Sequence, residues 1–297
     1  MRVFVTGASG WIGSAVVPEL LRAGHEVVGL ARNDASADRV RALGAEPHHG
    51  DLDDPGSLAA GAKAADGVVH LAYHHDFSQM AEAARKDRAA IEAMGEALAG
   101  SGGPLLIAAG TLGLRPGEVG TEEDRPDATV HPRVANSAVA LDLADRGVRP
   151  VAVRFAPTVH GPGDHGFVAT LVGVAREKGV SAYVGDGANR WPAVHRLDAG
   201  RLVRLALDGA AAGTAVHAVA EEGIATRDIA QAIGDSLGVP VESVAPEEAA
   251  AHFGWIGAFF AFDAPASSER TRALLGWEPT HPTLLEDLAA GAYLQRP

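Results

Sequence analysis

The 297-residue sequence contains no cysteine, which excludes disulfide bonds, a thiol nucleophile, iron–sulfur clusters and cysteine-ligated zinc. Aromatic residues make up only 5%, and 25 lysines and arginines are outnumbered by 38 aspartates and glutamates, for a net charge of −13. Nucleic-acid grooves and anionic membrane surfaces both need clustered positive charge, so neither is an expected partner. No run of about 18 uncharged apolar residues occurs and no secretory leader is visible, so we expect a cytoplasmic protein that acts on a small molecule.

Short apolar runs alternate with longer amphipathic segments over the first 155 residues. This alternation predicts βαβ units and a parallel sheet covered by helices on both faces. The predicted fold class is therefore α/β, a doubly wound parallel sheet of the Rossmann type with a smaller mixed C-terminal substrate region. The expected strands are 3–6, 26–31, 46–49, 68–72, 105–109 and 151–155, and the expected helices are 11–23, 35–43, 57–65, 78–98 and 135–145.

The pattern changes after residue 155, where glycine-rich loops and several prolines separate helical segments. The helices expected there are 167–177, 199–207, 226–237, 247–262, 267–275 and 284–293. We therefore place a dinucleotide-binding domain at residues 1–158, to which 194–218 returns. The substrate-binding region is placed at residues 159–193 and 219–297.

A glycine-rich turn at residues 6–13 directly follows the first expected strand and opens the first expected helix. Gly7 permits a tight turn, Gly10 lets the backbone approach a pyrophosphate, and Gly13 lets the helix pack close to the strand. The helix N-terminus would present N–H groups and partial positive charge to the anion. A plain strand–helix turn is the alternative interpretation. The predicted cofactor-binding residues are Thr6, Gly7, Ser9, Gly10, Trp11, Ile12, Gly13, Arg32, Asp51, Leu52, Leu71, Ala72, Tyr73 and Pro157.

The end of the second expected strand bears on the choice of cofactor. Folds that bind NAD usually place an acid there for the ribose 2′-hydroxyl, about 20 residues after the glycines. Here Arg32 lies nineteen residues after Gly13, and a guanidinium can fork onto a 2′-phosphate. We therefore predict a preference for NADP(H). The alternative is that Arg32 is a solvated surface residue and Asp34 binds a 2′-hydroxyl, which would favour NAD(H).

With these features in place, the chain resembles the extended and atypical branches of the short-chain dehydrogenase/reductase superfamily, the NAD(P)-dependent epimerase/dehydratase group. Residues 6–13 have the TGxxGxxG form of that family. Residues 154–163 resemble its R…VYGPG segment, with His160 in place of the tyrosine. Residues 191–198 resemble its FVHVxD segment, and residues 274–279 resemble its LGWxP segment. The resemblance covers nearly the whole chain and implies a Rossmann fold with a nicotinamide dinucleotide.

The sequence departs from the family at the catalytic centre. The family carries Tyr-x-x-x-Lys on the helix before the sixth strand, where the tyrosine protonates a carbonyl oxygen. No tyrosine or lysine occurs between residues 87 and 177, and Arg133 and Ser137 fall near the two positions. The family's Ser/Thr after the fifth strand corresponds to Thr111, or to Gly110 in its place. The resemblance thus assigns the chain to the atypical members.

Hydride transfer needs a group that polarises or protonates the acceptor. The candidates for this role are Tyr73, Thr111, Arg133 and His160. Tyr73 could instead pack under the cofactor, Arg133 could pair on the surface, and His160 and the nearby His165 could be structural loop residues. His195 is interpreted as structural. No metal site is expected, because the 13 histidines include no His-Glu-x-x-His pattern.

The function that we predict is an NADP(H)-dependent oxidoreductase, transferring hydride to a small, fairly apolar carbonyl or enone. The aromatic segment 253–262 would line its pocket, or else pack in a core or a homodimer seam. Arg190 matches a family position that can hold a substrate phosphate, but few basic residues surround it in the sequence. The alternatives are an epimerase, dehydratase or isomerase that retains NAD(P), and a non-catalytic NADP(H)-sensing protein.

Overall fold

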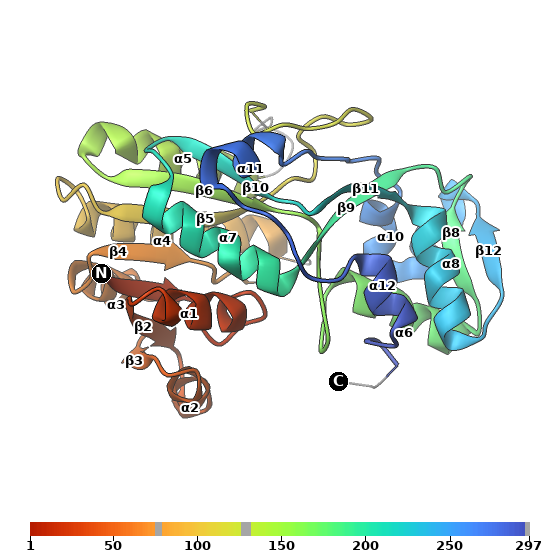
Figure 1. Cartoon of the computed structure of the whole chain (residues 1–297), viewed down its shortest axis with the longest axis horizontal. Coiled ribbons are helices and arrows are strands. Elements are labelled where there is room, and N and C mark those ends of the chain that lie inside the picture. The colour runs from red at the N-terminus through yellow and green to blue at the C-terminus, as the bar shows by residue number, and fades with distance from the viewer. Residues whose placement is uncertain (75–78, 126–131, 295–297) are drawn as a thin grey trace.

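The computed structural model describes residues 1–74, 79–125 and 132–294. Its larger part is a seven-stranded sheet in the order β10-β6-β5-β4-β1-β2-β3, in which every pairing is parallel (Figure 1). The strands are β1 (Arg2–Thr6), β2 (Glu26–Ala31), β3 (Glu46–His49), β4 (Gly67–His70), β5 (Pro104–Gly110), β6 (Arg149–Phe155) and β10 (Thr214–Ala218). The doubly wound Rossmann sheet is therefore confirmed.

Helices cover both faces of this sheet. One face carries α1 (Gly13–Arg22) and α7 (Arg196–Gly209), which pack against each other in the foreground of Figure 1. The other face carries α3 (Pro55–Lys63), α4 (Met80–Ala97) and α5 (Pro132–Asp142), and α2 (Asp34–Ala42) packs beside β2 and β3. A 3-10 turn, Leu143–Arg146, leads from α5 to β6.

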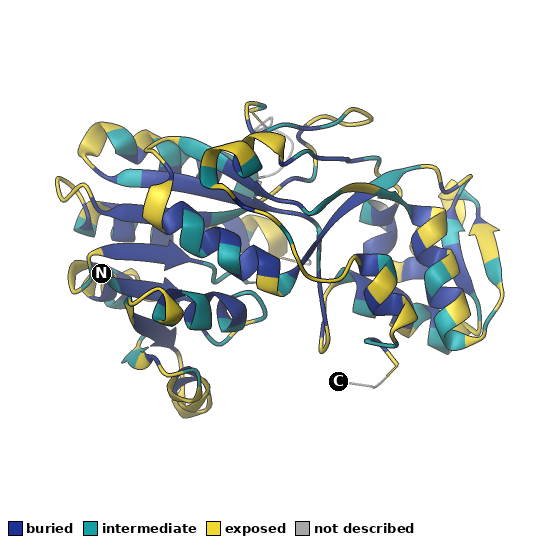
Figure 2. Cartoon of the chain, in the orientation of Figure 1, coloured by how far each residue is buried: buried dark blue, intermediate teal, exposed yellow. Residues whose placement is uncertain are grey.

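The two helical layers are held by alternate residues of the same strands. In β1, Val3 and Val5 belong to the core under α1 and α7, whereas Phe4 belongs to the core under α3 and α4. Residues of a strand point alternately to its two faces, so a strand buried on both faces must be apolar at every position. This explains the near-continuous apolar runs of the sequence and the dark centre of the sheet in Figure 2.

A smaller region lies beyond the carboxyl edge of the sheet. It contains a three-stranded sheet, β11-β9-β7, and a two-stranded parallel pair, β12-β8. Its elements are β7 (Thr158–His160), α6 (Phe167–Lys178), β8 (Ser181–Val184), β9 (Arg190–His195), β11 (Glu221–Ala225), α8 (Thr226–Leu237), β12 (Val241–Val244), α9 (Ala249–Phe253), α10 (Gly257–Phe260) and α12 (Leu284–Ala289). Trp191 and Phe260 meet edge to face in its core, 5.3 Å apart. The domain boundaries drawn from the sequence stay a prediction.

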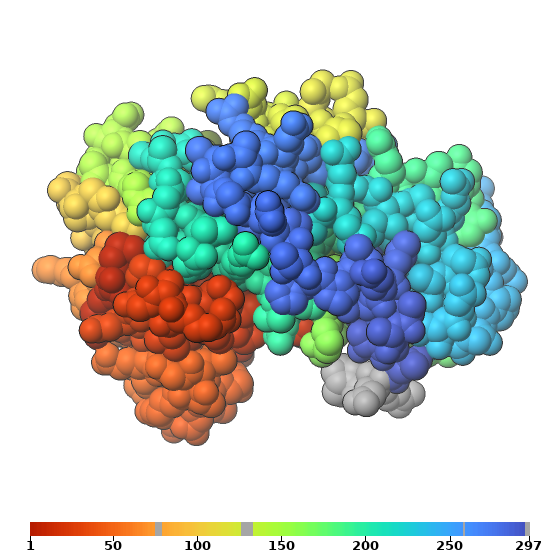
Figure 3. Space-filling view, viewed as in Figure 1, coloured from red at the N-terminus to blue at the C-terminus, as the bar shows by residue number. Residues whose placement is uncertain are grey.

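The C-terminal chain joins the two regions. Helix α11 (Glu269–Leu275) packs on α7 and β10, and the chain then crosses to α12, as the blue segment of Figure 3 shows. Asp198, which is fully buried, accepts hydrogen bonds from the backbone N–H groups of Thr280 and His281, both at 3.0 Å. The Trp277 indole also donates to the Asp198 carbonyl. These contacts fix the path of the crossing segment.

The continuous helix expected at 247–262 is wrong. Two short helices, α9 and α10, are separated by the 3-10 turn Gly254–Ile256, and a further 3-10 turn, Pro246–Glu248, precedes them. Gly254 adopts a positive φ of 64°, which ends α9. A side chain at Gly257 would lie 2.4 Å from the Ala249 carbonyl oxygen, so the two short helices pack too closely to form one rod. Among the described residues, no helix has both the length and the apolar character needed to cross a bilayer.

Candidate dinucleotide-binding and active site

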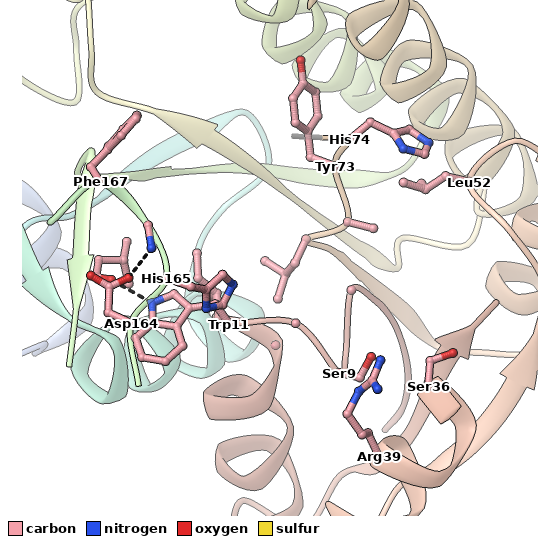
Figure 4. A pocket seen from close by; sticks show the side chains of 18 of the residues that line it. Ser9, Trp11, Ser36, Arg39, Leu52, Tyr73, His74, Asp164, His165 and Phe167 are labelled. Carbon is pink, nitrogen blue, oxygen red and sulfur yellow. Dashed lines mark hydrogen bonds between the residues drawn. The ribbon is translucent and has the colours of Figure 1, made fainter. Parts of the chain in front are cut away.

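A cavity of about 820 Å³ opens at the carboxyl ends of the parallel strands (Figure 4). In open α/β sheets this edge is where ligands bind, because the strand-to-helix loops of both halves meet there. Every cofactor residue predicted from the sequence except Thr6 lines this cavity, although their role in binding stays a prediction. The lining residues that the sequence reasoning did not assign to the cofactor are Leu30, Ser36, Arg39, His74, Thr158, Val159, Asp164, His165, Gly166, Phe167, Val168, Thr170 and Trp255.

The glycine turn has the close packing that a phosphate-binding loop requires. Gly7 has a φ of 68°, and the Gly10 N–H donates to the Gly7 carbonyl at 2.9 Å. A Cβ atom on Gly13 would lie 2.0 Å from the same carbonyl oxygen, so only glycine fits there. Helix α1 begins behind this turn with no side-chain cap at Ile12 and no acid in its first turn. Its N-terminal partial charge is therefore available to an anion.

Thr6 supports the turn from behind instead of lining the cavity. It is fully buried, and its hydroxyl oxygen accepts a hydrogen bond from the Ala72 N–H at 3.2 Å. Its hydroxyl proton is then directed to Nδ1 of His70, 2.7 Å away. Thr6 thus ties the end of β1 to the chain that leaves β4, which is the segment lining the cavity beside Gly7.

His70 begins a buried polar network that the sequence reasoning missed. With Nδ1 accepting from Thr6, the proton of its ring lies on Nε2, which faces Asp87 Oδ1 at 3.3 Å. The Asn136 amide donates to the other Asp87 oxygen at 2.6 Å and to the Ala84 carbonyl at 2.8 Å. Burial raises the pKa of Asp87, but the hydrogen bond from His70, with Asn136 and a nearby guanidinium, outweighs it and lowers the pKa. The network fastens α4 and α5 to the strand beneath the cavity.

One end of the cavity carries two cations. Arg32 follows β2 and Arg39 lies on α2, where Ser36 is one turn away on the same face of the helix (Figure 4). Both arginines are exposed, and within the described parts of the chain neither guanidinium makes a hydrogen bond or ion pair. A capping box between Asn33 and Ser36 fixes the start of α2 and hence the direction of this face. Asp34 does not line the cavity.

One of the four predicted catalytic residues lines the cavity, and a second contacts it there. Tyr73 follows β4 and lines it, and the Arg133 guanidinium from α5 lies 3.7 Å from the centre of the Tyr73 ring. Arg133 also donates to the Ala108 carbonyl at 3.3 Å. Burial raises the pKa of the Tyr73 phenol, while the positive charge of Arg133 opposes the rise. The phenol is therefore held protonated beside a cation that would stabilise its conjugate base.

The structure does not bring the other two candidates to the cavity. Thr111 follows β5 and is buried, and its hydroxyl has no hydrogen-bond partner among the described residues. His160 is fully buried on β7, where its Nδ1 lies 2.7 Å from Asp287 Oδ2 and its ring meets that of His195 edge to face. Thr158 on the same strand does line the cavity. His160 is directed instead into the junction with α12, and its catalytic role stays a prediction.

Arg190 is also removed from substrate binding. Its guanidinium pairs with the Asp263 carboxylate at 2.8 Å and contacts the Gly117 carbonyl, and it does not line the cavity. Of the aromatic segment 253–262, Phe253 and Phe260 pack in the core of the smaller region and Trp255 lines the cavity. Within the described ranges, no three histidine or acidic side chains gather as they would around a metal ion.

Comparison with known proteins places the chain among relatives along its whole length. It is 50% identical to an uncharacterized protein of Schizosaccharomyces pombe, covering 99% of this chain and 100% of the relative. It is 46% identical to an uncharacterized protein of Saccharomyces cerevisiae, covering 98% of both chains. A 2-alkyl-3-oxoalkanoate reductase of Stenotrophomonas maltophilia is 29% identical, over 72% of this chain and 68% of the reductase.

Solved structures share the fold. A dTDP-glucose 4,6-dehydratase of Streptomyces venezuelae with NAD and TYD bound matches with a TM-score of 0.77 at 24% identity, covering 98% of this chain and 96% of that one. A UDP-glucose 4-epimerase of Thermus thermophilus in complex with NAD matches with a TM-score of 0.75 at 21% identity, covering 98% of both. The model of the NAD dependent epimerase/dehydratase family matches residues 3–219, most of the chain. The chain therefore belongs to the NAD-dependent epimerase/dehydratase family, as the sequence motifs predicted.

Proposed function

We propose that this protein is an NADP(H)-dependent oxidoreductase that transfers hydride to a small, neutral and fairly apolar carbonyl or conjugated double bond. The observation that carries the proposal is the pair of exposed cations, Arg32 and Arg39, at one end of the cavity. The reductase from Stenotrophomonas maltophilia among the relatives supports an oxidoreductase. The dehydratase and epimerase among the solved structures share only the fold.

The two guanidiniums match the chemistry of a ribose 2′-phosphate. A guanidinium offers several donors in a fixed fork, and charge-assisted bonds to phosphate are stronger than neutral ones. A 2′-hydroxyl could accept a hydrogen bond from a guanidinium, but it is neutral and would leave the positive charge of both arginines uncompensated. Asp34, which would have to bind that hydroxyl in the alternative interpretation, stays outside the cavity. The lining therefore favours NADP(H) over NAD(H).

The glycine turn fits the rest of a dinucleotide. Side chains at Gly10 and Gly13 would meet the Gly7 carbonyl at 3.1 Å and 2.0 Å, and their absence leaves backbone at the surface where a pyrophosphate would lie. Leu71 and Ala72 continue the lining from the end of β4. When bound, the reduced cofactor supplies the hydride for the reaction.

Tyr73 is the proton donor in this proposal. As the carbonyl carbon of the substrate gains a hydride, its oxygen gains negative charge, and the Tyr73 O–H bond breaks to give that oxygen its proton. The product is an alcohol, and the phenolate recovers a proton from water. The Arg133 guanidinium over the ring favours the phenolate through its positive charge. Arg133 and Tyr73 together thus replace the acid that the family's missing Tyr-x-x-x-Lys would provide.

Steady-state assays with a panel of ketones and enones test this proposal. We expect consumption of NADPH that is faster at low cofactor concentration than consumption of NADH. Product formed without net cofactor oxidation would instead indicate an epimerase, dehydratase or isomerase. Tight NADPH binding with no turnover on any substrate would indicate a cofactor-sensing protein.

A further inference from the structure

The end of the cavity away from Arg32 and Arg39 is lined largely by aromatic and apolar side chains. Its described lining includes Phe167, Trp255 and Trp11 but no lysine or arginine. Figure 4 shows Phe167, His165 and Trp11 on one side of the cavity, with Ser9, Ser36 and Arg39 toward the other. Among the described lining residues, a substrate at this end therefore meets aromatic rings and no lysine or arginine.

Among the described residues that line this end, Asp164 is the one acid, and its presence further disfavours anions. Its two carboxylate oxygens accept hydrogen bonds from the Gly166 N–H at 2.7 Å and from the Tyr293 hydroxyl at 2.9 Å. Both partners donate, so the carboxylate is held as an acceptor in the buried wall of the cavity. A substrate carboxylate or phosphate placed here would meet like charge and no positive partner.

The aromatic side chains at this end are anchored by their neighbours. Phe167 opens α6 and contacts the buried Trp191 ring at 5.5 Å and the Trp255 ring at 5.5 Å. Trp255 is 43% exposed although Phe253 and Ile256 on either side of it are buried, because the turn at Gly254–Ile256 directs it outward. A large apolar ring left partly open at a cavity provides a surface for a ligand.

Trp11 is held equally firmly. Its indole N–H donates to the Val159 carbonyl at 2.7 Å, the Arg196 guanidinium lies 4.5 Å from its ring, and His165 meets it edge to face at 5.6 Å. An aromatic surface whose rings are already fixed loses little side-chain entropy when a ligand binds. It is thus prepared for a rigid, planar partner.

Resting on the proposed function, we infer that the substrate is an uncharged aromatic ketone or enone whose ring stacks against Phe167 and Trp255. Aromatic rings prefer edge-to-face or offset contact with other rings, and such pairs contribute beyond the area that they bury. The cavity of about 820 Å³ must also hold the dinucleotide, which leaves room for a small substrate only. A nucleotide sugar is disfavoured because its diphosphate would find no cation there.

A matched set of ligands tests this inference on the full-length chain. The set is 1-phenylethanone, its saturated counterpart 1-cyclohexylethanone, and the charged 4-acetylbenzoate. Binding to the protein saturated with NADP⁺ is measured by calorimetry, which requires no turnover, and NADPH consumption is measured with each ketone in parallel. We expect 1-phenylethanone to bind about fivefold more tightly than the cyclohexyl compound, within the range for one aromatic pair. The carboxylate should bind at least about tenfold more weakly than 1-phenylethanone.

Substitutions of Trp255 test whether its aromatic ring causes the preference for the phenyl ketone. Trp255→Leu should reduce the preference for the phenyl ketone at least about twofold, because only the Phe167 ring remains, whereas Trp255→Phe, which keeps a ring, should retain most of the preference. Phe262→Leu is the control, because Phe262 is 53% exposed and lies outside the cavity. It should behave as the unmodified chain.

The outcomes separate the inference from the proposed function. Equal or tighter binding of the cyclohexyl ketone, preferred binding of the carboxylate, or no binding of any of the three to the NADP⁺ complex would overturn the aromatic substrate while leaving cofactor use intact. A chain that binds no NADPH in a separate titration would overturn the proposed function, and the inference with it.

Discussion

Gly13→Ala is the substitution whose effect on stability and cofactor binding follows most directly from the packing of the glycine turn. A Cβ at residue 13 would lie 2.0 Å from the Gly7 carbonyl oxygen and 2.8 Å from the Cα and carbonyl oxygen of Ala8. All three atoms belong to the backbone, so no side chain can rotate away. Ordinary contact begins at 3.4 Å, and the Gly7 oxygen and the added Cβ must therefore separate by about 1.4 Å, at a typical overpacking cost of about 1–3 kcal/mol.

That separation also moves the N-terminus of α1 away from the phosphate position. We expect the free energy of unfolding, measured in urea, to fall by about 1–3 kcal/mol, and the affinity for NADPH to fall at least about tenfold. The matched control is Gly173→Ala, a glycine of α6 with nothing within 4 Å of its added Cβ. It should raise stability by about 0.5–1 kcal/mol, because alanine loses less entropy in a helix. A Gly13→Ala protein that is as stable as the parent and binds NADPH equally would refute this view of the turn.

Three further predictions concern single side chains. Tyr73→Phe should lower kcat about 100-fold or more while changing the Kd for NADPH less than about threefold, and an unchanged kcat would exclude the phenol as the acid. Burial lowers the pKa of His217 to about 4 from 6.5, with Arg154 as a neighbour, so the folded chain binds fewer protons than the unfolded chain between these values. His217 should therefore contribute up to about 3 kcal/mol to the decrease in the free energy of unfolding as the pH falls from 6.5 to about 4, and His217→Gln should remove this contribution in urea titrations, leaving that of His195, whose pKa is also lowered to about 4. Asp198→Ala removes the acceptor of the crossing segment and should cost about 3 kcal/mol, against less than about 1 kcal/mol for the surface control Asp208→Ala; equal losses would contradict the proposed role of Asp198.

The parallel sheet was predictable because its strands must be apolar on both faces. Val3, Phe4 and Val5 each fill a core, so burial leaves a continuous apolar run in the sequence. At least one strand of the smaller region, β12, leaves no such record. β12 contains Glu242 and Ser243 on an edge, and its pairing with β8 depends on chain that is distant in sequence.

The cavity was predictable where one short segment builds it, and less so where distant segments meet. The glycine turn and Arg32 lie close together in the sequence and follow a known spacing. Arg39 lies on α2, whose start is fixed by the capping box between Asn33 and Ser36. Its helical spacing from Ser36 places both residues on one face, but only the folded structure shows that this face lines the cavity. The Thr6–His70–Asp87 network joins three segments whose proximity no local pattern encodes.

The central claim is that Arg32 and Arg39 hold the 2′-phosphate of NADP(H). Calorimetric titration of NADPH and NADH into the unmodified chain and the Arg32→Ala, Arg39→Ala double variant measures this most directly. We predict that the chain binds NADPH at least about tenfold more tightly than NADH, and that the double variant binds both equally with its NADH affinity unchanged. Equal affinities in the unmodified chain, or a preference for NADPH that survives both substitutions, would contradict the account.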